Sequence, residues 1–476
     1  MVSAQAVKFV VMGASTVVLA RLLTPRDYGL VGMVVVVTGF VSLFKNLGLS
    51  TVMIQRPELT HEQVSTLFWL NLVISGALAL ITLLLSPFVA WFYSEPRLTA
   101  ITALFGIGFI ISALSSSHEA IIRRQMRFFV LAAIDICALL LGIVVAIVMA
   151  SRGAGVWALV FNQLTFLTVY TVGLWIVCSW LPGLPVRNSG VRPLLAFGRD
   201  LTGYNVLNYF TRNLDNLLIG KFWGAQQLGI YAKAYQLLLM PLEQLGIPLD
   251  GIALTALSRL TDSPDRYRRV YLRMLDKVAM FSMPGVALMI VTSDWLVRIL
   301  LGPTWMEAVR IFAVLGLMGI LEPTANTMGW LMISQGRSKH VFQWGIINST
   351  IAVGSFILGL KWGAFGIALS FSLMGVFVRV PLLFWFATRV GPIQTTDIYR
   401  RIVLPLVAAA IVFLTIYVIR DSVVVSPFVG MIIASALAFA VTLAVFLITS
   451  EGRARIKDVQ MMIRQILHRE AHDQMV

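Results

Sequence analysis

Apolar runs of about twenty residues recur along the whole chain, from its first residues to about Ile448. Each run is long enough to cross the hydrocarbon core of a bilayer as an α-helix. The chain is 58% hydrophobic and only 12% charged, and its mean hydropathy is +0.87. The longest polar interruptions, near 179–199 and 258–277, are too short to fold alone. The sequence therefore predicts an all-α polytopic membrane protein and excludes a soluble one.

Hydropathy and length together predict about fourteen transmembrane helices. They run approximately over 2–20, 28–44, 64–92, 99–114, 128–150, 154–178, 201–222, 228–257, 278–299, 308–333, 341–360, 364–388, 402–419 and 427–449. The eighth contains Pro241 and Pro248, so we expect a kink or break there.

The chain resembles itself at an offset of 200 to 210 residues. Residues 19–30 match 219–230, and Gln125 and Arg127 recur as Gln335 and Arg337. The first twenty residues are thus part of a repeat and not a signal peptide. Each copy holds six helices, and an even number gives both copies the same orientation about an axis along the membrane normal.

The repeat predicts the domain organisation of the chain. We expect an N-terminal lobe at 1–193, a C-terminal lobe at 194–390 and two further helices at 391–450. Residues 451–476 read as a basic amphipathic tail lying on the anionic cytoplasmic surface.

The formal net charge of +15 is interpreted as topology rather than as binding of nucleic acid. Most of the 37 Lys and Arg residues lie in segments that face the cytoplasm if the N-terminus is inside. Positively charged loops remain on that side of the membrane. We therefore predict that both termini are cytoplasmic.

The predicted span near 199–224 carries polar side chains within the membrane. Asn205, Asn208, Arg212 and Asp215 are spaced so that they share one helical face. An Arg near the middle of a span costs about 2.5–3.5 kcal/mol, so it should face protein or a wet cavity. Two interpretations remain open: a structural Arg212–Asp215 pair, or the wall of a cationic, substrate-binding cavity.

Other intramembrane charges extend the list of candidates. Arg379 is a further candidate for substrate binding, and Glu322, Asp215 and Glu243 are candidates for ion coupling. Pairs that only pack helices together are the alternative for Glu322 and Arg379.

The sequence indicates neither a metal site nor a cofactor. Cys137 and Cys178 lie within spans, and the five histidines, including His118, fall in predicted loops or the tail without ligand-like spacing. We interpret these histidines as solvated. The chain also lacks a nucleotide-binding glycine loop and a nucleophile–base motif, so we expect a protein that is not an enzyme.

Four segments resemble bacterial polysaccharide flippases of the Wzx type: 19–29 (LARLLTPRDYG), 46–49 (NLGL), 124–128 (RQMRF) and 213–220 (NLDNLLIG). Within that family the resemblance is closest to the colanic-acid-exporter branch of the multidrug/oligosaccharidyl-lipid/polysaccharide superfamily. Relatives usually have a dozen or more residues ahead of the first helix. Here Met1 falls almost inside it, so we expect either an earlier natural start or a shortened first helix.

The resemblance implies a function and its partners. The protein would move an undecaprenyl-pyrophosphate-linked oligosaccharide from the cytoplasmic to the periplasmic leaflet of the bacterial inner membrane, by alternating access between two six-helix lobes. Arg212 could supply a cationic partner for the pyrophosphate. The lipid-linked glycan, membrane lipids and polysaccharide polymerase or co-polymerase machinery would be partners of a monomeric protein.

Two other functions remain open. A multidrug exporter of the same superfamily would have twelve helices and a site suited to cationic drugs. A membrane glycosyltransferase, polymerase or ligase acting on the same lipid would need a sizeable periplasmic loop with catalytic acids or bases. The predicted outside loops are short, which argues against the enzyme.

Overall fold

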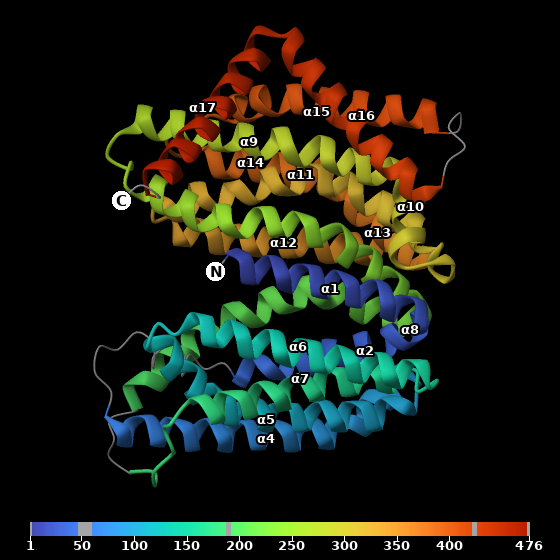
Figure 1. Cartoon of the computed structure of the whole chain (residues 1–476), viewed down its shortest axis with the longest axis vertical. Helices are drawn as coiled ribbons and strands as arrows, with labels where there is room; N and C mark the ends of the chain where they lie inside the picture. The colour runs from blue at the N-terminus through green and yellow to red at the C-terminus, as the bar shows by residue number, and fades with distance from the viewer. Residues whose placement is uncertain (1, 46–59, 187–191, 421–425, 474–476) are drawn as a thin grey trace. The chain divides into compact units, whose positions relative to one another are not determined.

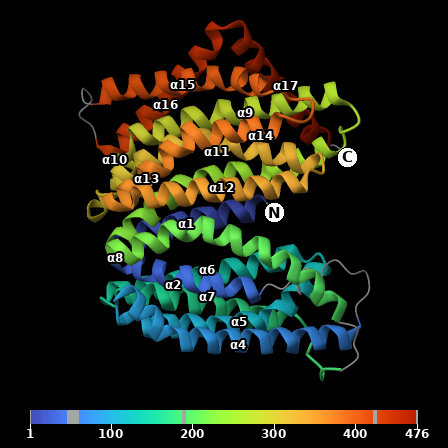
Figure 2. The same cartoon turned by 180° about the vertical axis from the view of Figure 1, so that it is seen from behind.

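A computed structural model describes residues 2–45, 60–186, 192–420 and 426–473, and every regular element in these ranges is helical (Figures 1 and 2). Ten helices of the described part are long and apolar enough to cross a membrane, or eleven if the bent pair Tyr209–Gln244 and Leu249–Ser258 forms one span. The all-α, multi-pass membrane class is therefore confirmed, whereas the count of fourteen stays a prediction.

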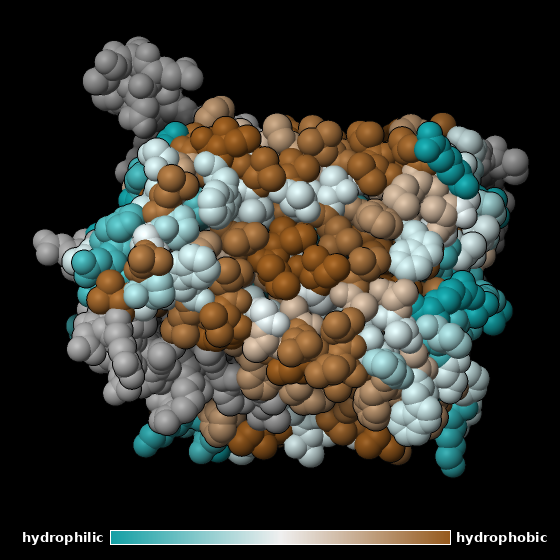
Figure 3. All heavy atoms as spheres, turned by 90° about the horizontal axis from the view of Figure 1, so that it is seen from below, coloured by the Kyte–Doolittle hydropathy of each residue, from teal (hydrophilic) through white to brown (hydrophobic). Residues whose placement is uncertain are grey.

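The surface has the character that a lipid environment requires. Figure 3 shows one face, on which apolar residues gather in a broad central region and hydrophilic ones gather towards two opposite ends. Large apolar side chains such as Leu84 and Phe439 are each 70% exposed. Contiguous apolar surface of this kind marks a region that contacts lipid or protein rather than water.

The structure divides into two compact units. Unit 1 comprises Met1–Ala232 and Leu300–Thr304, and unit 2 comprises Lys233–Ile299 and Trp305–Val476. The boundary at Ala232 lies inside a helix and does not test the predicted lobe boundaries at 193 and 390, which stay predictions.

Unit 1 is built from antiparallel helix pairs. Its helices are α1 (Val2–Leu22), α2 (Pro25–Lys45), α4 (His61–Tyr93), α5 (Arg97–Arg124), α6 (Phe128–Ser151), α7 (Val156–Val177) and the first part of α8 (Arg192–Ser258). The most extensive packing is between α4 and α5 and between α6 and α7. Helix α4 begins at a capping box, in which Thr60 and Gln63 bond each other's backbone N–H groups reciprocally.

Helix α5 is longer than the predicted span at 99–114, and this corrects the interpretation of His118. The polar segment after Leu114 stays helical up to Arg124. His118 is fully buried rather than solvated, and its ring stacks on Trp175 with centroids 4.4 Å apart. Neighbouring aromatic rings from α4 and α7 enclose this part of α5, so a segment that reads as polar is interior.

Unit 2 contains the remaining helices. They are the rest of α8, α9 (Pro264–Val291), α10 (Ser293–Leu300), η1 (Pro303–Trp305), α11 (Ala308–Ser334), α12 (Ser338–Gly359), η2 (Leu360–Trp362), α13 (Gly363–Met374), η3 (Gly375–Arg379), α14 (Val380–Thr388), α15 (Thr395–Arg420), α16 (Pro427–Ile448) and α17 (Ser450–Asp473). Helices α10 and η1 each straddle the boundary with the 300–304 segment of unit 1.

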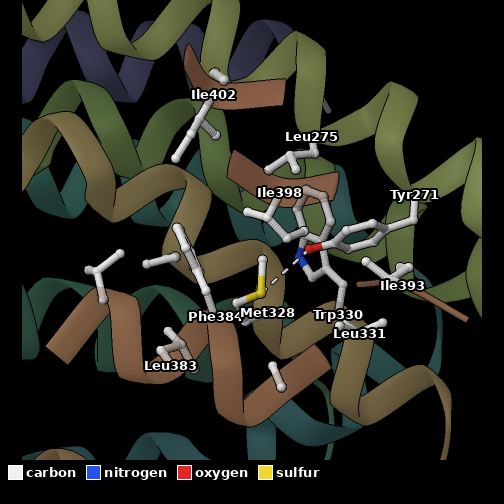
Figure 4. Packing of buried hydrophobic residues seen from close by; sticks show 14 of the residues in the cluster. Tyr271, Leu275, Met328, Trp330, Leu331, Leu383, Phe384, Ile393, Ile398 and Ile402 are labelled. Atoms are coloured by element: carbon white, nitrogen blue, oxygen red, sulfur yellow. Dashed lines mark hydrogen bonds between the residues drawn. The ribbon is translucent and has the colours of Figure 1, made fainter. Parts of the chain in front are cut away.

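The core of unit 2 includes part of the segment 258–277, which the sequence predicts to be a polar interruption between spans. In α9, Tyr267, Tyr271 and Leu275 recur every four residues and are at most 1% exposed. This period marks one face of an amphipathic helix, so 264–277 is helix and not loop. Figure 4 shows Tyr271 and Leu275 meeting side chains from α11, α14 and α15. The Tyr271 hydroxyl is hydrogen-bonded to the Thr327 hydroxyl at 2.9 Å, so it is paired within the apolar core.

Helix α8 is interrupted where the sequence predicts it. Gly224 has a left-handed φ of 79° and separates the two predicted spans. The helix also bends by 47° between Tyr209–Gln244 and Leu249–Ser258, in agreement with the kink expected at Pro248.

One pair of turns supports the internal repeat directly. The turn at 125–127 joins α5 to α6, and the turn at 335–337 joins α11 to α12. Met126 and Gly336 take left-handed φ values of 58° and 69°. The Arg127 and Arg337 N–H groups donate to carbonyls five residues earlier, at 3.2 and 3.0 Å. The two copies thus fold into the same local structure at an offset of 210.

Candidate functional site

Arg379 lies in a single π-helical turn, η3, between α13 and α14. Pro381 lies two residues further on and cannot donate to the carbonyl of Phe377, and its ring crowds that carbonyl. A wider turn at this place accommodates the proline. Isolated π-helical turns are rare and occur often at functional sites.

The turn directs Arg379 towards α11. Gly375 is buried against Met318, and one turn further along each helix Arg379 faces Glu322. The Arg379 Nη2 atom lies 3.6 Å from Glu322 Oε2, and the guanidinium carbon is 4.4 Å from the centre of the Phe371 ring. The Arg379 side chain is only 12% exposed, whereas Glu322 is 35% exposed.

Most N–H donors of Arg379 have no acceptor among the described residues. A guanidinium carries five N–H donors. The contact with Glu322 is an ion pair beyond ordinary hydrogen-bond distance. Arg379 donates no hydrogen bond within the part of the chain that the structure describes. Helix α11 and the segment Ser338–Thr388 are both long and apolar enough to cross a membrane, so Arg379 lies on a candidate membrane span.

Asp215 of α8 differs from Arg379 because its carboxylate is hydrogen-bonded within the protein. Its side chain is 5% exposed and accepts hydrogen bonds from the Tyr231 hydroxyl and from the Asn216 N–H, each at 2.8 Å. Tyr231 is itself 1% exposed. The carboxylate therefore joins the two halves of α8 on either side of Gly224.

Arg212 does not form the structural pair considered from the sequence. Its side chain is exposed, and it makes no ion pair with Asp215 in the described structure. The part of α8 that carries Arg212 is held against α2, because the Tyr209 hydroxyl donates to the carbonyl of Val36 at 2.6 Å.

The two halves of the repeat also meet near Gly224. A methyl group on Gly29 would overlap the carbonyl oxygen of Ala225, and one on Gly229 would overlap that of Pro25. Gly29 and Pro25 correspond to Gly229 and Ala225 at the offset of 200. Helix α2 and the second part of α8 thus cross at backbone contact within unit 1, and both glycines are required for that approach.

The other predicted residues are more scattered. The side chains of Asn205 and Asn208 lie outside the described residues. Glu243 is exposed on α8. Asp250, which is not among the predicted site residues, accepts a hydrogen bond from the Trp330 indole at 2.6 Å and so links α8 to α11.

The sequence interpretation missed two groups of charges. Lys8 of α1 pairs with Asp135 of α6 at 2.6 Å. Asp276 of α9 pairs with Arg401 of α15 and with Arg455 of α17. The sequence does contain one signal for the second group. Asp276 directly follows Leu275, which lies on the buried face of α9 together with Tyr267 and Tyr271.

Outside the spans, Glu95 connects the α4–α5 turn to α2. Its carboxylate lies 2.7 Å from Arg26 and 3.1 Å from Arg97. Partial burial raises the pKa of Glu95, but the hydrogen bonds and charges of the two arginines outweigh burial and hold its pKa below the ordinary value.

Comparison with known proteins identifies the family. The model of a family described as "Polysaccharide biosynthesis protein" matches residues 18–310. This chain belongs to that family. The matched range includes Arg212 and Asp215 and ends before Glu322.

One curated relative of this polysaccharide biosynthesis protein is the lipopolysaccharide biosynthesis protein WzxC of Escherichia coli (strain K12). The two are 23% identical over 424 residues, which cover 88% of this chain and 84% of the relative. The resemblance to Wzx-type polysaccharide flippases is thus confirmed.

Two solved structures share its fold. The lipid II flippase MurJ, in an inward closed conformation, superimposes with a TM-score of 0.74 at 14% identity, covering 93% of this chain and 96% of that one. An inward-facing multidrug resistance transporter of the MATE family gives a TM-score of 0.63 at 13% identity, covering 82% and 95%. At these identities the similarity concerns the fold alone.

Proposed function

We propose that this polysaccharide biosynthesis protein is a flippase that moves an undecaprenyl-pyrophosphate-linked oligosaccharide from the cytoplasmic to the periplasmic leaflet of the bacterial inner membrane. The family supports a carbohydrate substrate, and a fold shared with a lipid II flippase supports transport across the bilayer. On this proposal both termini are cytoplasmic, and the protein is a transporter rather than an enzyme.

The observation that carries the proposal is the intramembrane guanidinium of Arg379. A pyrophosphate bears several negative oxygens, and a planar guanidinium binds such oxygens through two parallel hydrogen bonds. Arg379 has N–H donors that make no hydrogen bond among the described residues, and its side chain is only 12% exposed. Placing a phosphate there would satisfy the cation and also compensate the desolvation of the anion.

Each unit contributes one intramembrane cation on this proposal. Arg212 in unit 1 has an exposed side chain and could meet the same class of anion. We assign substrate binding to Arg379 and Arg212, with Asn205 and Asn208 on the same predicted face as Arg212. Alternating access of two six-helix lobes would carry the bound lipid across.

Glu322 is the best-placed group for ion coupling. It competes with the phosphate for Arg379, so protonation of Glu322 would release the guanidinium to the substrate. Asp215 and Glu243 remain weaker candidates, because Asp215 is committed to Tyr231 and Glu243 has no partner cation among the described residues. We propose a monomer that delivers its substrate to polymerase or co-polymerase machinery.

The test is the leaflet distribution of lipid-linked oligosaccharide in a deletion strain. The strain is complemented with wild type, Arg379→Ala, Arg212→Ala or Arg389→Ala. Arg389 is a matched control, because its guanidinium also lies 4.4 Å from an aromatic ring centre, that of Phe386, but at the end of α14.

Complete repeat units trapped on the cytoplasmic leaflet without the protein, and released by wild type and Arg389→Ala only, support the flippase. Arg212→Lys should restore part of the activity lost in Arg212→Ala. Units that reach the periplasm but stay unpolymerised would point instead to an enzyme acting after translocation. Unchanged lipid distribution together with lost drug efflux would favour the multidrug exporter.

A further inference from the structure

Phe371 of α13 contacts the Arg379 guanidinium, although regular helical spacing would not bring the two side chains together. In the sequence they are eight residues apart. With about 3.6 residues per turn, residues eight apart differ by about 80° around an α-helix, whereas residues seven apart nearly coincide. The π-helical turn contains one additional residue, and in it the Val380 N–H donates to the Gly375 carbonyl, five residues earlier. This additional residue places Arg379 on the same helical face as Phe371.

Gly375 lies between these two residues on that face. Side chains of a helix lean towards its N-terminus, so Arg379 extends back past Gly375 towards Phe371. A methyl group on Gly375 would lie 3.6 Å from the Nη2 atom of Arg379, which is ordinary van der Waals contact. The guanidinium carbon lies over the Phe371 ring, 4.4 Å from the ring centre. Arg379 therefore folds back along its own helix onto an aromatic ring.

The Phe371 ring is itself held by packing. It stacks on Phe356 of α12, with ring centroids 5.3 Å apart and an angle of 24° between the ring planes. Phe356 is 2% exposed, and Phe371 also packs against the buried hydrophobic core of unit 2. Side chains in a close-packed interior have little freedom to move. The ring is therefore a rigid support for the guanidinium.

The ring contact restrains Arg379 without using its N–H donors. A cation over an aromatic face is attracted by the ring itself, and no oxygen acceptor is involved. Glu322 Oε2 lies 3.6 Å from Nη2, which is too far for a hydrogen bond that would fix the orientation of the guanidinium. Among the described residues, Phe371 is thus the contact that restrains the guanidinium plane. That plane decides where two parallel hydrogen bonds can reach a phosphate.

We infer that Phe371 is a positioning residue for substrate binding: it holds the Arg379 guanidinium in the orientation in which its N–H donors meet the pyrophosphate. This inference rests on the proposed function, in which Arg379 binds that group. Without the ring the guanidinium keeps its charge, but its side chain has to be ordered when the substrate binds. Ordering a long side chain weakens binding, so the ring contributes to affinity although it does not donate to the substrate.

The experiment measures the affinity of farnesyl pyrophosphate, a short polyprenyl pyrophosphate, for the full-length protein in neutral detergent. Calorimetry is used because the stoichiometry also gives the fraction of folded protein. Wild type is compared with Phe371→Leu, which removes the ring, with Phe371→Tyr, which keeps it, with Arg379→Ala, and with the double variant that combines Arg379→Ala with Phe371→Leu. Phe386→Leu is the matched control, because Phe386 lies under the Arg389 guanidinium at the same distance of 4.4 Å but belongs to α14.

Phe371→Leu should weaken binding by roughly 2- to 10-fold, the effect of ordering one long side chain, whereas Phe371→Tyr and Phe386→Leu should bind like wild type. In the Arg379→Ala background, Phe371→Leu should have no further effect, because the ring acts only through the guanidinium. An equal loss in both backgrounds, an equal loss in Phe371→Tyr, or wild-type affinity of Phe371→Leu would overturn the inference and leave the proposed function standing. Wild-type affinity of Arg379→Ala, or no binding by wild type, would contradict both.

Discussion

Asp215 and Arg379 are both charges within predicted spans, but their surroundings differ in kind. Asp215 accepts two hydrogen bonds at 2.8 Å and is closed off from solvent. Arg379 is almost as buried, yet its one acidic neighbour is 3.6 Å away. A buried charge whose bonds are completed by its own fold contributes to stability, whereas one with unspent donors is prepared for a ligand. The contrast supports our proposal that Asp215 stabilises the fold and that Arg379 binds the substrate.

Arg379→Ala is expected to have the largest effect on transport and little effect on folding. The substitution removes the N–H donors that would bind the pyrophosphate. The Glu322 carboxylate loses its cationic neighbour, but because its side chain is 35% exposed it can be hydrated instead. The flipping rate in proteoliposomes should fall roughly 10- to 100-fold, as expected for loss of about 1.5–3 kcal/mol of charged hydrogen bonding. Arg379→Lys should retain part of the rate, since a point charge replaces the fork. A lower melting temperature with normal flipping would reverse the assignment.

Asp215→Ala should show the opposite pattern. The Tyr231 hydroxyl would be left buried without its acceptor, which costs about 1–3 kcal/mol. We expect a lower thermal midpoint and less protein in the membrane, with a normal flipping rate per folded molecule. Asp215→Asn keeps an acceptor oxygen and should be milder. If Asp215→Asn folds normally but does not flip, Asp215 is a coupling group after all.

Glu322→Gln should change transport moderately and in a different direction. The carboxylate competes with phosphate for Arg379, so its neutralisation should leave substrate affinity equal or higher, by roughly tenfold at most. The response of flipping to an imposed proton gradient should be lost if Glu322 couples transport to protons. A variant with the full gradient response would remove Glu322 from the coupling mechanism.

Glu95→Gln provides the smallest effect and a reference outside the membrane. Arg26 and Arg97 are each about half exposed, so the cluster contributes on the order of 0–1 kcal/mol at neutral pH. Because the pKa of Glu95 is lowered on folding, this stability is present above the unfolded pKa and is lost as the pH falls through the folded one. Melting curves of wild type and Glu95→Gln should therefore converge in acid. A constant difference down to low pH would contradict the ionic origin.

Much of the fold follows from local features of the sequence. Span length and hydropathy predict the membrane class, and the Gln125–Arg127 and Gln335–Arg337 turns predict the repeat, because each depends on residues that are adjacent in the chain. The kink near Pro248 follows from its missing N–H. His118 was misassigned because the residues around it are polar, and only the rings packed from other helices make its position interior.

The polar sites were less predictable for a physical reason. Arg401 and Asp276 are 125 residues apart, and nothing in either neighbourhood indicates the other. The helical spacing of Arg212 and Asp215 permits a pair, but the bond of Asp215 to Tyr231 depends on the turn at Gly224. The sequence could indicate that Arg379 and Glu322 lie within spans, whereas the π-helical turn that brings them together is a tertiary feature.

The most direct test of the central claim is the affinity of a short polyprenyl-pyrophosphate-linked glycan for the purified protein, compared between wild type, Arg379→Ala and Asp215→Asn. The account predicts that Arg379→Ala weakens binding by roughly 10- to 100-fold and that Asp215→Asn binds like wild type. Wild-type affinity in Arg379→Ala would contradict it, because the pyrophosphate would then be held elsewhere.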